Sequence, residues 1–274
     1  MSTTIHEFAP SRALAPYVEL IWEASFNTVS DPLLQLKVVP NGFLELIIHV
    51  SDRHCQLARR GIWIPSPDYT IIGLHTEPYE VRFSGEVRVT AIRIKPEAVR
   101  NLFGIPASEF HRQYEDMEMV LGAGFRSFCS KLIETELQSH RLDLIEVWLL
   151  GRLERNGLPL TYVNHAAEMI RDVDGYIGVE DLCSRVYISK RQLEREFRRQ
   201  VGITPKMYMR IARLNAVHRV LQTQDVQDLS RIAYRYGYAD QSHFIRDFRE
   251  FTGERPGLFV KNREDFIVNV QSAC

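Results

Sequence analysis

This sequence is short of the features that mark secreted, membrane-spanning and cysteine-rich proteins. Its 274 residues include four cysteines and no Cys-x-x-Cys pair, so neither a disulfide framework nor a cysteine-rich zinc site is expected. No apolar run approaches the roughly 20 residues that a membrane-spanning helix needs. The first residues lack the basic and apolar regions of a signal peptide, and we therefore expect a cytoplasmic protein with reduced thiols.

Motifs of common enzyme classes are also missing. The sequence has no Gly-rich phosphate-binding loop and no Gly-x-Ser-x-Gly nucleophile motif. Cys55 follows His54, but no third group is defined that would orient this pair for catalysis. His49, His54, Cys55 and His75 have the chemistry of metal ligands, yet they lack the close spacing of a metal site. We therefore expect no enzyme, no metal and no other cofactor.

Net charge is small in total and unevenly distributed. The chain has 34 Lys+Arg and 35 Asp+Glu, a net charge of -1, which by itself argues against binding to nucleic acid. However, residues 1–175 contain 17 basic and 23 acidic side chains, whereas residues 176–256 contain 15 basic and 10 acidic ones. The second segment is therefore basic enough to bind a polyanion.

The first hundred residues contain many short segments rich in β-branched and aromatic residues. Gln35–Val39 and Phe43–Val50 flank a Pro-Asn-Gly turn signal, and Tyr79–Phe83 and Val87–Lys95 flank a Ser-Gly-Glu hairpin signal. Further candidate strands are Tyr17–Phe26, Gly61–Ile64 and Thr70–Leu74. This pattern predicts an antiparallel β-rich domain that forms a sheet, a sandwich or a small barrel.

Helical patterns begin near residue 96. Pro96 precedes a short predicted helix at Glu97–Phe103, and apolar residues recur at helical spacing within Gly124–Gln138 and Leu142–Arg155. The last two helices either form a dimer seam or pack on the sheet, because two heptads of apolar spacing do not separate these alternatives.

The rest of the chain is predicted to be all-helical. The helix-stop sequence Asn-Gly-Leu-Pro at 156–159 divides the chain into a first domain at 1–156, a second at 157–262 and a tail at 263–274. The first domain has its helical end at about 96–156. The fold class is therefore α+β, with an antiparallel, barrel-like first domain. Helices of the second domain are expected at Thr161–Val173, Val179–Val186, Lys190–Val201, Pro205–Gln222, Asp228–Tyr236, Gln241–Thr252 and 256–261.

A repeated motif lies in the basic segment. The sequence Leu-x-Arg-Glu-Phe-Arg at 193–198 recurs 51 residues later as Phe-x-Arg-Asp-Phe-Arg at 244–249, and each copy is followed at the same spacing by Gly-x-x-Pro. A short helix and a tight turn precede each copy, which is the signature of a helix-turn-helix. Two copies within about 80 residues are stronger evidence than one.

Each copy carries residue types suited to contacting a major groove. Ser189 and Asp240 are expected to cap the second helix of their copies, and an apolar pair four residues apart in each is expected to face the core. Arg side chains suit guanine, Gln suits adenine, and Glu accepts from cytosine. The candidate DNA-binding residues are Ser189, Lys190, Arg191, Gln192, Glu194, Arg195, Arg198 and Arg199 in the first copy and Gln241, Ser242, His243 and Arg246 in the second.

Residues from about 160 to 258 resemble the DNA-binding domain of the AraC/XylS family of bacterial transcription regulators. The first motif of that family is carried by Leu182, Ile188, Ser189, Leu193, Arg195, Phe197, Gly202 and Pro205. The second is carried by Ile232, Ala233, Gly237, Phe244, Arg246, Phe248, Gly253 and Pro256. The departures are Cys183, Tyr238 and Phe259, and none is a candidate DNA-binding residue.

The resemblance implies a mechanical arrangement. The helix at Pro205–Gln222 would link two helix-turn-helix units, whose second helices enter successive major-groove segments about 34 Å apart. Base contacts would come from Arg191, Arg195 and Arg246, and phosphate contacts from Lys190, Arg198, Arg199 and Lys206. The implied partners are double-stranded DNA, RNA polymerase, a second copy in a homodimer and a small-molecule effector, with no membrane among them.

The first domain resembles the small β-rich sensory domain of a subset of these regulators. Trp22 and the Val-Pro-Asn-Gly-Phe-Leu-Glu-Leu-Ile sequence at 39–47 carry the resemblance, which implies effector sensing, dimerisation or both. Strand alternation places Glu45 and His49 on one face. We therefore expect an effector pocket that includes Trp22, Glu45, His49, Trp63 and Tyr79. The structural alternative is that Glu45 pairs with Arg88 or Arg93.

Three functional hypotheses follow from these patterns. The leading one is a ligand-responsive, sequence-specific transcription regulator that binds DNA through both helix-turn-helix units. The second is a ligand-independent regulator whose first domain only dimerises. The third is an enzyme or DNA-repair sensor fused to a DNA-binding module.

Overall fold

Two β-sheets form the first part of the molecule. The computed structural model describes residues 2–28, 34–59, 61–223, 229–261 and 266–267. One sheet has, in spatial order, β1 (Ser2–Phe8), β2 (Val18–Asn27), β9 (Glu86–Ile94), β4 (Leu44–His49), β7 (Tyr69–Ile72) and β10 (Tyr114–Asp116). The other has β11 (Phe266–Ile267), β3 (Leu34–Val38), β8 (Tyr79–Phe83), β5 (Gln56–Arg59) and β6 (Ile62–Pro65). All pairings are antiparallel except that of β11 with β3, so the predicted antiparallel β-rich domain is confirmed.

The strand partners implied by the two turn signals are wrong. Gly42 and Gly85 have the positive φ that their turns require, at 82° and 79°. However, β3 pairs with β8 and β4 pairs with β9 and β7, so each turn carries the chain from one sheet to the other instead of closing a hairpin. The physical reason is burial: all six residues of β4 are buried, so this strand needs a layer on each of its faces.

The two faces of β4 contact different cores. Leu44, Leu46 and Ile48 pack beneath the helices, whereas Ile47 packs between the sheets with residues such as Leu36 and Val81. The predicted alternation along this strand is therefore confirmed.

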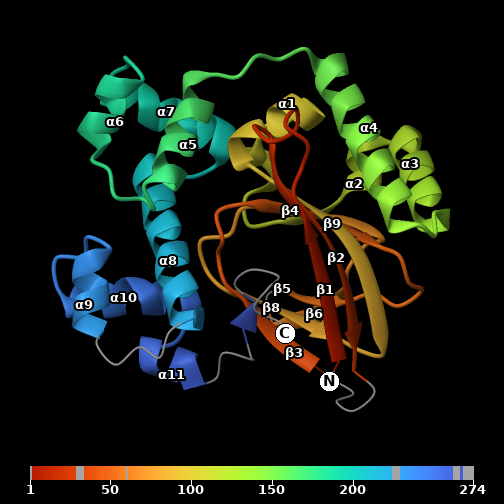
Figure 1. Ribbon diagram of the computed structural model, residues 1–274, viewed down its shortest axis with the longest axis horizontal. Coiled ribbons are helices and arrows are strands. Elements are labelled where there is room, and N and C mark those ends of the chain that lie inside the picture. The colour runs from red at the N-terminus through yellow and green to blue at the C-terminus, as the bar shows by residue number, and fades with distance from the viewer. Residues whose placement is uncertain (1, 29–33, 60, 224–228, 262–265, 268–274) are drawn as a thin grey trace.

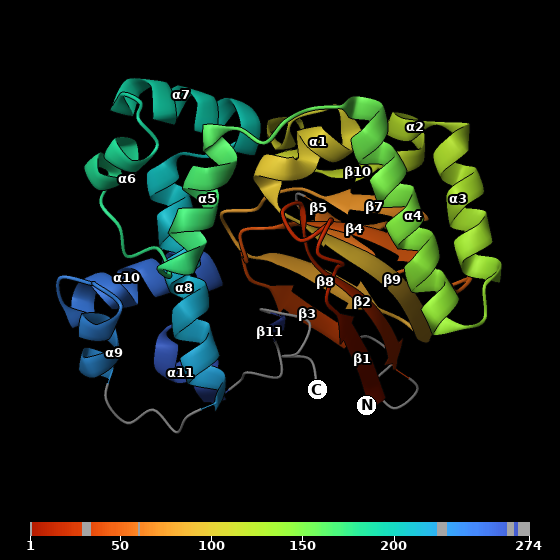
Figure 2. The same ribbon diagram turned by 45° about the horizontal axis from the view of Figure 1, so that its top comes forward.

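Helices cover the outer face of the six-stranded sheet (Figure 2). They are η1 (Pro96–Ala98), α1 (Val99–Phe103), η2 (Ala107–Phe110), α2 (Met117–Leu121), α3 (Ala123–Glu134) and α4 (Gln138–Asn156). In α3 and α4 the buried apolar residues, among them Phe128 and Ile145, belong to the same core as Leu46. Of the two alternatives for this helix pair, packing on the sheet is the one observed.

The second part of the chain is a set of short helices grouped around one long helix (Figure 1). These are α5 (Tyr162–Asp172), α6 (Val179–Arg185), α7 (Lys190–Val201), α8 (Pro205–Thr223), α9 (Leu229–Arg235), α10 (Gln241–Thr252) and α11 (Pro256–Lys261). They match the predicted helices closely, although the predicted start at Asp228 and most of the predicted tail lie outside the described residues. Among the described residues, no helix has the length and apolar character to cross a membrane.

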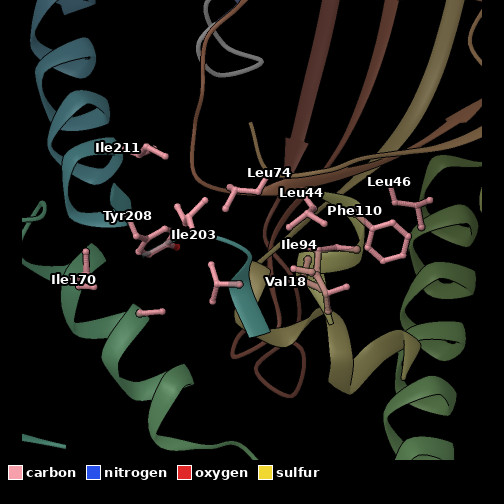
Figure 3. Packing of buried hydrophobic residues seen from close by; sticks show 14 of the residues in the cluster. Val18, Leu44, Leu46, Leu74, Ile94, Phe110, Ile170, Ile203, Tyr208 and Ile211 are labelled. Carbon is pink, nitrogen blue, oxygen red and sulfur yellow. The ribbon is translucent and has the colours of Figure 1, made fainter. Parts of the chain in front are cut away.

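The helical part packs directly on the β-rich part. Tyr208 and Ile211 extend from α8 toward the β-rich part and belong to one core with Leu44 and Leu74 (Figure 3). Ser108 of η2 donates a hydrogen bond of 2.8 Å from Oγ to the carbonyl oxygen of Arg199 at the end of α7. The helix-turn-helix units are therefore held against the first domain at several points.

Candidate functional site

The first helix-turn-helix consists of α6 and α7. Ser189 precedes α7, and its Oγ accepts a hydrogen bond of 3.3 Å from the backbone N–H of Gln192, as predicted for an N-cap. Leu193 and Phe197 are fully buried, so they anchor one face of α7 in the core. The helix ends at Gly202, whose φ of 94° allows the tight turn into α8. The opposite face of α7 is left exposed.

The second helix-turn-helix consists of α9 and α10 and repeats this construction. Asp240 Oδ1 accepts a hydrogen bond of 2.7 Å from the backbone N–H of His243. Phe244 and Phe248 are fully buried and anchor α10. The repeat found in the sequence therefore corresponds to two capped helices with equivalent buried anchors and equivalent exposed faces.

An ion-pair network that the sequence patterns did not reveal fixes α10 to α8. Arg210 of α8 places Nη2 2.7 Å from Asp247 Oδ1 and 2.6 Å from Glu250 Oε2. Asp247 is buried and belongs to the repeated motif at the position that Glu196 occupies in the first copy. The only sequence signal for this contact was an acidic residue between two anchor residues.

The candidate DNA-binding residues lie on the exposed faces of α7 and α10. Gln192, Glu194 and His243 are half-buried, and all the others are exposed. Three of the cations form ion pairs within the protein: Lys190 with Glu180 at 2.9 Å, and Arg195 and Arg199 with Glu196 at 3.2 and 2.7 Å. Within the described part of the chain, no ion pair is formed by Arg191, Arg198 or Arg246. Lys206 is exposed at the start of α8.

A cavity lies between the two sheets, lined mainly by apolar side chains. Its volume is roughly 100 Å³, of the same order as the cavity of about 150 Å³ that binds benzene in another protein. Trp22, Glu45 and Tyr79 line it, three of the five residues predicted for an effector pocket. The cavity is therefore large enough for a few non-hydrogen atoms.

Glu45 forms the polar end of this cavity together with three donors. Arg93 Nε lies 2.5 Å from Glu45 Oε1, Trp22 Nε1 donates to Oε2 at 3.0 Å, and Asn41 Nδ2 donates to Oε1 at 3.3 Å. The predicted pairing of Glu45 with an arginine is thus observed, with Arg93 as the partner. The cavity wall and the structural ion pair turn out to be the same group of residues.

The other two predicted pocket residues lie elsewhere. His49 stacks on His54 with ring centroids 4.5 Å apart, and its Nε2 lies 3.5 Å from Cys55 Sγ. Burial lowers the pKa of His49 to about 4, so its imidazole is neutral near pH 7. Trp63 lies on β6 with the Arg82 guanidinium 4.5 Å from its ring centroid. Neither residue lines the cavity. The prediction was wrong for these two because strand alternation indicates which face a side chain is on, but not where along the sheet it lies.

Comparisons with known families divide the chain in two. Residues 6–116 match a family described as a domain of unknown function (DUF6597). Residues 182–262 match a family described as a helix-turn-helix domain. The second match begins within α6, covers both capped helices α7 and α10, and ends one residue beyond α11.

Curated relatives match about a quarter of the chain. The HTH-type transcriptional activator RhaS of Citrobacter koseri is 34% identical over 70 residues, which cover 26% of this chain and 25% of that protein. The RhaS protein of Escherichia coli strain K12 is 31% identical over 80 residues, 29% of this chain and 28% of that protein. The chain thus matches about a quarter of the length of these relatives.

Solved structures that the comparison matches to this chain include ToxT from Vibrio cholerae. That structure is 12% identical, covers 95% of this chain and 97% of its own, and has a TM-score of 0.49. A transcriptional regulator from Chromobacterium violaceum, described by its AraC-type DNA-binding domain, is 23% identical and covers 38% of this chain and 91% of its own, with a TM-score of 0.35.

Proposed function

We propose that this chain, which matches a domain of unknown function at residues 6–116 and a helix-turn-helix domain at residues 182–262, is a sequence-specific transcription regulator of the AraC type controlled by a small molecule. The single observation that carries the proposal is the duplication: two capped helices, α7 before α8 in the chain and α10 after it, each bury one face and expose the other. In this role the protein acts on the chromosome in the cytoplasm and contacts RNA polymerase. The RhaS relatives are named as activators, and activation is the direction we propose.

The candidate cations differ in whether they must break an ion pair before they contact DNA. Arg191, Arg198 and Arg246 form no ion pair within the described residues, so their guanidinium groups exchange only water for DNA. Arg195 and Arg199 must first release Glu196, and Lys190 must release Glu180. Bidentate Arg–guanine contacts contribute about 1–3 kcal/mol of discrimination each. We assign base reading to Arg191, Arg195 and Arg246, and phosphate binding to the remaining cations.

The effector is proposed to bind in the cavity between the sheets. The lining is mainly apolar, and its charged pair, the Glu45 carboxylate and the Arg93 guanidinium, is mutually neutralised. An uncharged, mainly apolar molecule suits such a site, because a charged ligand would find no unpaired counter-ion there. This chemistry favours the ligand-responsive regulator over one whose first domain only dimerises, and a homodimer is compatible with either.

The three cysteines that the structure describes offer no support for the enzyme alternative. Cys55, Cys129 and Cys183 are buried, and burial raises the pKa of the Cys55 thiol to about 12. Since the thiolate is the nucleophile, a cysteine in this state is unreactive near pH 7.

Selection of DNA by the full-length protein from a random duplex library tests the proposal. We expect enrichment of a motif with two conserved blocks about one helical turn apart, since each of the two recognition helices, α7 and α10, enters the major groove once. Arg246→Ala should relax sequence preference in one block only, and Lys206→Ala should weaken binding to all sequences alike. A library from which no sequence is enriched would contradict the proposed function.

A further inference from the structure

The turn that follows β3 touches the cavity and the DNA-binding domain at the same time. Asn41, Phe43 and Arg93 line the cavity between the sheets, and they also line a second, polar cleft between the β-rich part and helices α5 and α8. The cleft has a volume of about 440 Å³. An occupant of the cavity that displaces these residues therefore also changes the lining of the cleft.

On the cavity side, the turn is fixed by the carboxylate of Glu45. The side-chain amide of Asn41 donates to Glu45 Oε1, which also receives the Arg93 guanidinium, while Trp22 holds the other carboxylate oxygen. Asn41 Oδ1 in turn accepts a hydrogen bond of 3.0 Å from the backbone N–H of Phe43. The conformation of the turn thus depends on the group that lines the cavity.

On the other side, the turn is fixed by α8. Asn215 of α8 donates from Nδ2 to the backbone carbonyl oxygen of Asn41 at 2.6 Å, a contact between residues 174 positions apart. A Cβ atom placed on Gly42 would lie 3.3 Å from Cγ2 of Ile211 and 3.5 Å from Cε2 of Tyr208. The backbone of the turn is therefore in close contact with Tyr208, Ile211 and Asn215, which are spaced about one helical turn apart along α8.

The position of α8 determines the geometry of both recognition helices. The helix runs from the end of α7 to the second unit (Figure 1), and Arg210 fixes α10 to it through Asp247. Tyr208 also accepts a hydrogen bond of 2.7 Å from Arg171, whose guanidinium binds Glu97 at 2.6 Å. A shift of α8 relative to the β-rich part changes how α7 and α10 are presented to DNA.

We propose that the turn at 40–43 is a mechanical relay: an occupant of the cavity acts through Glu45 and Asn41 on Asn215, and thereby on the spacing of the two recognition helices. Asn215 is a positioning residue in this scheme and touches neither effector nor DNA. The inference depends on the proposed function, because it assumes DNA binding and cavity occupancy. Typical coupling between two such sites changes affinity by roughly 5- to 150-fold.

The test compares two asparagines that make the same kind of bond. Asn215→Ala and Asn215→Asp remove the donor to the Asn41 carbonyl. Asn156→Ala is the matched control, because Asn156 Nδ2 donates a hydrogen bond of the same kind to the carbonyl oxygen of Asn101 at 2.8 Å. Asn156 is far from the turn in the sequence and lines neither the cavity nor the cleft. The assay measures the affinity of the full-length protein for a duplex that it has itself selected, with and without benzene as the cavity probe.

The relay predicts a specific pattern of affinities. Benzene should change the DNA affinity of the wild type and of the Asn156→Ala variant by about fivefold or more, and that of both Asn215 variants by less than about twofold. A thermal shift with benzene should persist in the Asn215 variants, because the cavity itself is intact. Variants at Asn215 that respond to benzene as the wild type does would overturn the relay, as would a wild type whose DNA affinity benzene does not change. Failure of the wild type to select any sequence would instead contradict the proposed function.

Discussion

Removing the carboxylate of Glu45 should destabilise the first domain strongly. The Arg93 side chain is 4% exposed and that of Glu45 is 11% exposed, so the Glu45→Ala variant removes a carboxylate that lies 2.5 Å from a buried guanidinium. Breaking a buried ion pair in this way costs about 3–5 kcal/mol of the free energy of unfolding. Trp22 and Asn41 also lose their acceptor, which places the expected loss toward the upper part of that range.

A double variant separates the contribution of the buried charges to stability from the contribution of packing. Replacing both partners, as in Glu45→Leu with Arg93→Met, removes both buried charges and keeps most of the volume, so the stability should return to within about 1–2 kcal/mol of the wild type. Urea unfolding of the full-length protein, followed by circular dichroism, gives both values. A loss below about 1 kcal/mol for Glu45→Ala would refute the view that the pair is buried and essential. A double variant no more stable than the single one would show that Glu45 acts through its other contacts.

Three further outcomes are expected. Ser189→Ala should lower stability by about 0.5–2 kcal/mol, measured by urea unfolding, since the N-cap acceptor of α7 is lost; an unchanged midpoint would contradict the capping role. Cys55 should label with iodoacetamide only after unfolding, because burial raises its pKa to about 12, and rapid labelling of the native protein, seen by mass spectrometry, would disprove this. His218→Phe should stabilise the protein in acid: among the described residues neither buried ring nitrogen has a hydrogen-bond partner, and burial lowers the pKa to about 3, so the unfolded state alone gains a proton as the pH falls from about 6.5 toward 3. The wild type should therefore lose up to about 1.4 kcal/mol per pH unit there through this group, and a variant with an unchanged acid slope would exclude it as the cause.

Local signals predicted the helices well and the sheet partners poorly. The limits of α7 follow from Ser189 at one end and Gly202 at the other. Each of these residues directly adjoins the helix in the sequence. The Gly42 turn, by contrast, specifies only that the chain reverses. Which strand then lies beside β4 depends on burying both of its faces, and that is decided by residues throughout the domain.

The candidate site shows the same division. The exposed face of α7 could be predicted because buried Leu193 and Phe197 fix its orientation through helical spacing alone. The sequence limited the ion-pair partner of Glu45 to Arg88 or Arg93 but did not decide between them. The contact between Asn41 and Asn215 joins residues 174 positions apart, and no local pattern marks it.

The parallel pairing of β11 with β3 imposes an order on folding during synthesis. Phe266 is buried and packs on Phe259 of α11 at 4.6 Å between ring centroids, so the edge of β3 is completed by a segment made more than 220 residues later. Until then the nascent five-stranded sheet has an open edge, which is where unintended strand pairing begins. Cutting the chain after the first domain would leave that edge open permanently. The β-rich part of this protein is therefore complete only when the helical part has been made.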